Sequence, residues 1–181
     1  MTVHRRSLSP IVCAALAATI TTFLLARPAA AAETVSRVRS SDRSIADLIE
    51  QAAKHSPTLT RLVAAVEVSD GIVYVEPGRC PQGVAACLKL WMVTSGSTRF
   101  MRIIVDRRRL ASDWRLMGAV GHELQHVIEV LSDRFVTDGN GVYFFYRRYV
   151  PTDADRFETK AAIRTGDAVE DELRSWRADT R

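Results

Sequence analysis

Several features that mark other classes of protein are scarce or missing in this chain of 181 residues. Its apolar stretch from Ile11 to Leu25 is shorter than the ~20 residues that a helix needs to span a bilayer. The three cysteines form no CxxC pair, which argues against a zinc knuckle. No internal repeat or low-complexity region follows residue 32, so the remaining chain suits one domain with a modest core.

The first 32 residues have the composition of a secretory signal peptide. A positive segment containing Arg5 and Arg6 precedes the apolar stretch, and the small residues Ala29 to Ala32 precede a cleavage point expected before Glu33. We therefore expect an exported protein, periplasmic or secreted, which keeps no stable membrane anchor once residues 1–32 are removed.

Neither sign of charge dominates the expected mature chain. The whole sequence carries 25 Lys and Arg against 21 Asp and Glu, but removal of Arg5, Arg6 and Arg27 leaves 22 basic side chains. This balance gives no electrostatic basis for binding nucleic acid, and we expect no nucleic-acid partner.

Two cysteines, Cys80 and Cys87, remain after Cys13 has left with the signal. An even pair in an exported protein predicts one disulfide. It would close the short loop from Pro81 to Ala86 and stabilise the fold by ~2–3 kcal/mol. Metal binding by this pair is the alternative interpretation.

Hydrophobic periodicity predicts a flexible lead-in at residues 33–43 and a single domain of helices and strands over residues 44–181. The first expected helix begins at a cap on Ser44, the second runs from a cap on Ser56 to about Val66, and the third begins at a cap on Ser112. A fourth covers 142–150, and the last runs from Asp153 or Asp155 to Trp176. Expected strands are Ile72–Val75, Leu88–Thr94 and Phe100–Asp106.

An HExxH pattern, formed by His122, Glu123 and His126, lies within the helix expected after Ser112. Residues i and i+4 lie about 40° apart around a helix axis, so both imidazoles project to one side and can bind one Zn²⁺. Glu123 is rotated by about 100° from His122 and can reach a water on the metal instead of the metal itself. This chemistry is that of a zinc hydrolase. The alternative is an amphipathic helix whose outer face carries two histidines by chance.

The third ligand is left open by the residues alone, although a catalytic zinc usually takes three. No histidine follows His126, and Glu129 and Ser132 occupy positions at which a metzincin has Gly and His. The candidates are a carboxylate, His55 or a less usual group. Glu129 shares a helix face with both histidines and is expected to support a ligand or to be the alternative ligand. His55 is expected to cap a helix or lie at the surface.

The HExxH motif together with Glu158, within Phe157–Ala162, resembles the gluzincin branch of the zincin-like metallopeptidases, in which a Glu from a later helix completes the zinc site. The resemblance covers the motif helix and the helix expected around Glu158. It implies a zincin-like α+β fold, with a small antiparallel or mixed sheet packed on the HExxH helix and further helices after it. It also implies that Zn²⁺ is bound by His122, His126 and Glu158. The Asp that some gluzincins place four residues after the ligand Glu is replaced by Ala162.

The same resemblance implies hydrolysis of a peptide or other amide substrate, with Glu123 as general base. Tyr146 or Tyr149 would donate to the oxyanion, and the strand Phe100–Val105 would be an edge that pairs with extended substrate. An amidase with the same chemistry is one alternative. Another is a non-proteolytic exported domain whose zinc site is structural or degenerate and which acts in binding or envelope assembly. Glu123 argues against the latter, since a structural site does not need it.

Overall fold

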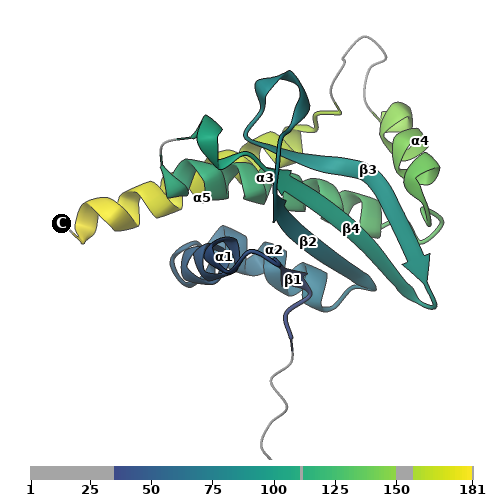
Figure 1. Ribbon diagram of the computed structural model, residues 1–181, viewed down its shortest axis with the longest axis horizontal. Coiled ribbons are helices and arrows are strands. Elements are labelled where there is room, and N and C mark those ends of the chain that lie inside the picture. The colour runs from purple at the N-terminus through teal and green to yellow at the C-terminus, as the bar shows by residue number, and fades with distance from the viewer. Residues whose placement is uncertain (1–34, 111, 150–156, 181) are drawn as a thin grey trace, which may run out of the picture. The chain divides into compact units, whose positions relative to one another are not determined.

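The computed structural model describes residues 35–110, 112–149 and 157–180, which belong to one compact unit, Val35–Arg181. The expected signal peptide and its cleavage point lie outside the described residues. Within them the fold is α+β, with five α-helices and one four-stranded mixed sheet (Figure 1). The elements are β1 (Val38–Arg39), α1 (Arg43–His55), α2 (Pro57–Glu67), β2 (Gly71–Pro77), η1 (Pro81–Gly83), β3 (Ala86–Ser95), β4 (Thr98–Val105), η2 (Arg107–Arg109), α3 (Asp113–Leu131), α4 (Gly139–Tyr149) and α5 (Lys160–Asp179).

The sheet has the strand order β1-β2-β4-β3. β1 runs parallel to β2 and β2 parallel to β4, whereas β3 is antiparallel to β4. Alternate residues of β2 and β4 are buried, among them Val73, Val75, Met101 and Ile103, as expected for strands with one face in the core. The edge position predicted for Phe100–Val105 is wrong, because β4 is paired on both sides. Strand order depends on contacts far apart in sequence, which local periodicity does not reveal.

β3 is therefore an edge strand, and it forms the expected hairpin with β4. Its register with β4 shifts between Leu88 and Met92, which marks a bulge. Gly139, at the start of α4, lies so close to this bulge that a Cβ atom there would be 2.4 Å from the carbonyl oxygen of Leu90. Figure 1 shows α4 beside β3. The part of β3 around Leu88 is the part that faces the candidate site.

The first two helices begin at capping side chains. Ser56 accepts a hydrogen bond from the Leu59 N–H and starts α2, with Pro57 in the first turn, as predicted. The cap of α1 is Asp42, which accepts from the Ile45 N–H, and the predicted cap at Ser44 is wrong. Asp and Ser are about equally good caps, so the spacing of apolar residues alone does not distinguish two candidates that lie two residues apart.

Residues 35–43 differ from the flexible lead-in that was predicted. Val38 is buried and pairs with Val73 as part of β1. The carboxylate of Glu67 accepts hydrogen bonds from the Arg37 N–H and the Ser36 hydroxyl. A two-residue strand is too short for alternation to reveal it, and its partner lies more than 30 residues away.

α3 packs across the sheet and lies alongside α5, while α1 and α2 pack against α3 and β2. The C-terminal end of α3 is tied to β4 by the buried Arg99. Its guanidinium pairs with Asp70 and donates to backbone carbonyls at the end of α3 and just beyond, those of Val130, Leu131, Asp133 and Val136. These bonds satisfy carbonyls that a helix end leaves without partners and fix α3 relative to the sheet.

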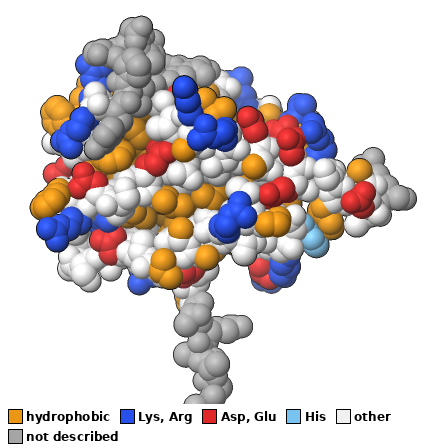
Figure 2. Space-filling view, turned by 180° about the vertical axis from the view of Figure 1, so that it is seen from behind, with side chains coloured by type: hydrophobic (Ala, Val, Ile, Leu, Met, Phe, Trp, Pro, Cys, Tyr) orange, Lys and Arg blue, Asp and Glu red, His pale blue; other side chains and the backbone are white. Residues whose placement is uncertain are grey.

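Charged side chains of both signs are scattered over the face shown in Figure 2, and hydrophobic side chains gather in a band across its middle. Among the described helices, none combines the length and hydropathy that crossing a bilayer requires.

Candidate metal centre

α3 supplies four of the predicted site residues, His122, Glu123, His126 and Glu129, and its two histidines project from the side of the helix that faces away from its core stripe. Leu116, Val120, Leu124 and Val127 are buried in the hydrophobic core, as the 3.6-residue period predicts. The histidines on the opposite side of α3 are partly shielded from solvent, because α5 packs against that side.

The contact between α3 and α5 is close because three glycines lie in it. A Cβ atom on Gly118 would be 2.9 Å from Cβ of Glu170, and one on Gly166 would be 3.0 Å from Cβ of His122. Gly121 meets Val169 in the same way, at 2.8 Å. The absence of side chains here lets α5 pack closely against the face of α3 that carries His122.

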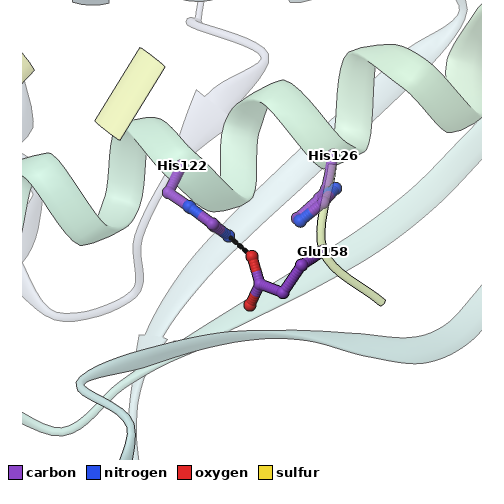
Figure 3. Close-up of side chains that lie close together, drawn as sticks. All are labelled: His122, His126 and Glu158. Atoms are coloured by element: carbon purple, nitrogen blue, oxygen red, sulfur yellow. Dashed lines mark ion pairs between the residues drawn. The ribbon is translucent and has the colours of Figure 1, made fainter. Parts of the chain in front are cut away.

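His122, His126 and Glu158 come together to form a group whose potential ligand atoms all lie within 4.8 Å of one another. His122 Nε2 is 3.1 Å from Glu158 Oε2, and the two imidazole centroids are 4.9 Å apart. Figure 3 shows both rings projecting from α3 toward the Glu158 carboxylate. Two imidazoles and one carboxylate form the ligand set of many catalytic zinc sites, so this group could hold a metal ion.

One buried atom tests whether a metal fits this group. His126 is 4 % exposed, and its Nε2 has no hydrogen-bond partner among the described residues. Its other ring nitrogen, Nδ1, lies 3.0 Å from Glu129 Oε2, and a carboxylate can only accept, so Nδ1 carries the proton. Nε2 is thus a buried polar atom left without a partner, an arrangement that is costly unless a metal takes it.

Glu158 lies just before α5 and not within a helix, so the predicted helix start at Asp153 or Asp155 is wrong. α5 begins at Lys160, and the Thr159 hydroxyl caps it by accepting from the Ala162 N–H. Thr is among the preferred N-cap residues, and the hydrophobic periodicity of residues 157–176 does not reveal such a cap. Residues 150–156 lie outside the described part of the chain.

Glu129 holds His126 in place and does not belong to the ligand group. Its second oxygen, Oε1, accepts a 2.7 Å hydrogen bond from the Thr159 hydroxyl. Burial opposes ionisation of Glu129, but the bonds from His126 and Thr159 outweigh burial and lower its pKa. An ionised Glu129 on Nδ1 keeps the His126 ring oriented, the arrangement common around zinc-binding histidines.

Glu123 projects into the same cleft, next to the ligand group. Its Oε2 accepts a 2.7 Å hydrogen bond from the backbone N–H of Leu88 in β3. Burial raises the pKa of Glu123, against the lowering effect of His122, His126 and the Leu88 N–H. A carboxyl group with a raised pKa is suited to exchanging protons near neutral pH.

The pKa of His122 is raised as well. Burial acts to lower it, but the neighbouring carboxylates of Glu158, Glu123 and Glu129 together outweigh burial and favour the imidazolium. The surplus of negative charge around His122 is the kind of environment that also favours a metal cation.

The two tyrosines predicted as oxyanion donors differ in what the structure describes. Tyr146 is buried, its hydroxyl donates a 2.9 Å hydrogen bond to the backbone carbonyl of His126, and burial raises its pKa. In this arrangement Tyr146 supports the second histidine. Tyr149 ends α4, and its side chain lies outside the described part of the structure.

A cleft of about 530 Å³ contains the ligand group. Its walls include β3 around Leu88, α5 around Gly166, and the loop that Cys80 and Cys87 close. The sulfurs of these two cysteines lie at disulfide distance, with Cα atoms 5.8 Å apart, as the even pair predicted. His55 is outside the ligand group, and its ring stacks on Trp176 at a centroid distance of 3.7 Å.

Sequence reasoning missed two groups that hold the site together. The Leu88 N–H is a backbone group and has no residue signature. Thr159 follows Glu158 directly, and its preference for helix N-cap positions is the one sequence signal that could have drawn attention to it.

Comparisons with protein-family models, with curated proteins and with solved structures find no match to this chain.

Proposed function

We propose that this protein is an exported zinc-dependent hydrolase, a metallopeptidase that cleaves peptide or other amide bonds. The observation that carries the proposal is the meeting of Glu158 with His122 and His126, while Glu123 stays outside the ligand group in the same cleft. A structural zinc site has no use for such an additional buried carboxylate.

His122, His126 and Glu158 would hold the zinc. When bound, zinc supplies an acidified water and polarises a carbonyl. Glu123 accepts the proton of the attacking water and returns it to the leaving amine. The Leu88 N–H holds Oε2 of Glu123, which leaves Oε1 as the oxygen that would take the proton. Glu129 and Tyr146 keep His126 in position throughout.

Export is part of the same proposal. It is supported by the signal-like composition of residues 1–32 and by the Cys80–Cys87 pair, since disulfides persist in oxidising compartments.

Glu123→Gln separates catalysis from metal binding, because glutamine keeps the acceptor for Leu88 but cannot take a proton. Zinc-loaded protein is incubated with a mixed peptide library and with simple amides, and products are identified by mass spectrometry. We expect Glu123→Gln to lower the cleavage rate by at least about 100-fold and to bind as much zinc as the wild type.

Glu50→Gln, an exposed change on α1, is the control and should cleave at the wild-type rate. Cleavage by Glu123→Gln at the wild-type rate would contradict the proposal. Zinc-loaded wild-type protein that cleaves nothing in either set would instead favour the non-proteolytic domain with a structural site.

A further inference from the structure

The cleft extends from the metal ligands mainly in one direction. The α3 residues that line it run from Arg115 to His126, so the ligand group lies at one end. At this end the rings of Tyr146 and Phe157 stack at 5.3 Å beside His126. A substrate bound at the metal therefore extends along the N-terminal half of α3, between β3 and α5.

α5 forms the wall of this extension next to the first ligand. Gly166 lies against His122, since a Cβ atom on Gly166 would be 3.0 Å from Cβ of His122. The next residue, Asp167, lines the cleft. Asp167 is thus the first charged side chain that a substrate meets on this wall beyond the metal ligands.

Within the described residues, no cationic side chain pairs with Asp167. Arg115, the cation in the cleft lining, lies 3.8 Å from Glu170, and the two compensate each other. Asp167 is exposed and makes no ion pair or side-chain hydrogen bond with any residue in the described part of the chain. Even Arg164, one turn earlier on α5, is not paired with it.

Besides the charged groups, apolar side chains form part of the cleft walls. Leu88, Leu110, Ala119 and Ile163 line the cleft. Apolar side chains together with an unpaired, exposed carboxylate match a substrate side chain that has an aliphatic stem and a cationic end.

Building on the proposed function, we propose that Asp167 is a specificity-determining residue that selects substrates carrying a basic side chain, Lys or Arg, next to the scissile amide. The aliphatic stem lies against the apolar walls and the cation pairs with the Asp167 carboxylate.

Two zinc-binding hydroxamates test this by binding, without any need for turnover. N-acetyl-lysine hydroxamate and N-acetyl-norleucine hydroxamate have the same stem and differ in the terminal ammonium. Their Kd values for the zinc-loaded full chain are measured by calorimetry at low salt, where an exposed pair is least screened. We expect the lysine compound to bind at least about threefold more tightly to the wild type, and Asp167→Asn to abolish this preference.

Asp171→Asn is the matched control, because Asp171 lies on the same helix and pairs with Arg174 outside the cleft lining. It should keep the preference. Equal binding of both compounds to the wild type, or a preference that survives Asp167→Asn, overturns the specificity inference and leaves the proposed function standing. If neither compound binds the zinc-loaded protein, the accessible metal centre is refuted and both proposals are overturned.

Discussion

His126 is held in place by contacts with both its ring and its backbone. Glu129 accepts from Nδ1, and the Tyr146 hydroxyl donates to the backbone carbonyl. The Tyr146 ring also meets the imidazole edge-on, with centroids 5.3 Å apart. The unpartnered Nε2 therefore has one direction available, toward Glu158 and His122. Such preorganisation lowers the cost of binding a metal, since little side-chain freedom is left to lose.

At this scale, Glu129→Gln tests the orienting role. Glutamine can still accept a hydrogen bond from Nδ1 but removes the negative charge that strengthens it. We expect zinc affinity to fall by about 10- to 100-fold, measured by competition with a chelator at neutral pH. Glu50→Gln should leave the affinity unchanged. An unaltered affinity in Glu129→Gln would show that the contact with His126 does not tune the metal centre.

Among the elements, the packing of α5 on α3 is expected to affect the candidate metal centre most, because Glu158 lies just before α5 and both histidines lie on α3. Gly118→Ala is expected to push them apart, because the new Cβ would lie 2.9 Å from Cβ of Glu170 and 3.1 Å from the carbonyl oxygen of Gly166. Alanine improves helix propensity by roughly 1 kcal/mol, while overpacking costs about 1–3 kcal/mol. We expect a net loss of about 1 kcal/mol in the free energy of unfolding, measured with urea, and a weaker zinc affinity. A more stable variant with unchanged affinity would show that the helices have room to spare.

α5 also caps α2 through Glu172, and this contact should depend on pH. Burial opposes ionisation of Glu172, but bonds from the Ser56 hydroxyl and from the hydroxyl and N–H of Thr58 outweigh it and lower its pKa. A pKa lower in the folded than in the unfolded state stabilises the fold above the unfolded pKa, and this contribution is lost as the pH falls through the folded pKa.

We therefore expect Glu172→Gln to lower the free energy of unfolding by about 1 kcal/mol at pH 7, a modest value because the group is partly in solvent. The difference from the wild type should shrink as the pH falls below the usual glutamate range, near 4.3. Urea unfolding at a series of pH values measures it, and the exposed Asp179→Asn provides a control. A difference that stays constant down to pH 3 would rule out ionisation as the cause.

For the whole molecule, sequence reasoning succeeded where the pattern is local. The HExxH face of α3, the Ser56 cap of α2 and the three longer strands all follow from residues within a few positions of one another. Glu158 was a candidate ligand on the strength of a resemblance, and the structure places it beside both histidines.

It failed where the determinant is distant in sequence. β1 is a strand because it pairs with β2, more than 30 residues away. β4 is an interior strand because it pairs in parallel with β2 on the side opposite β3. The hydrogen bond from Leu88 to Glu123 joins β3 to α3 through a backbone group that no residue type announces. These contacts exist only once the chain has folded, so local periodicity does not contain them.

The proposed zinc ligands are the basis of every functional proposal made for this protein. The most direct measurement is the zinc content of the purified protein and of Glu158→Ala by elemental analysis, after equilibration with a small excess of zinc and removal of unbound ion. We predict about one zinc per chain in the wild type and a substoichiometric amount in Glu158→Ala, because a catalytic site needs its three protein ligands. No zinc in the wild type, or wild-type zinc content in Glu158→Ala, would contradict the assignment of His122, His126 and Glu158 as the metal centre.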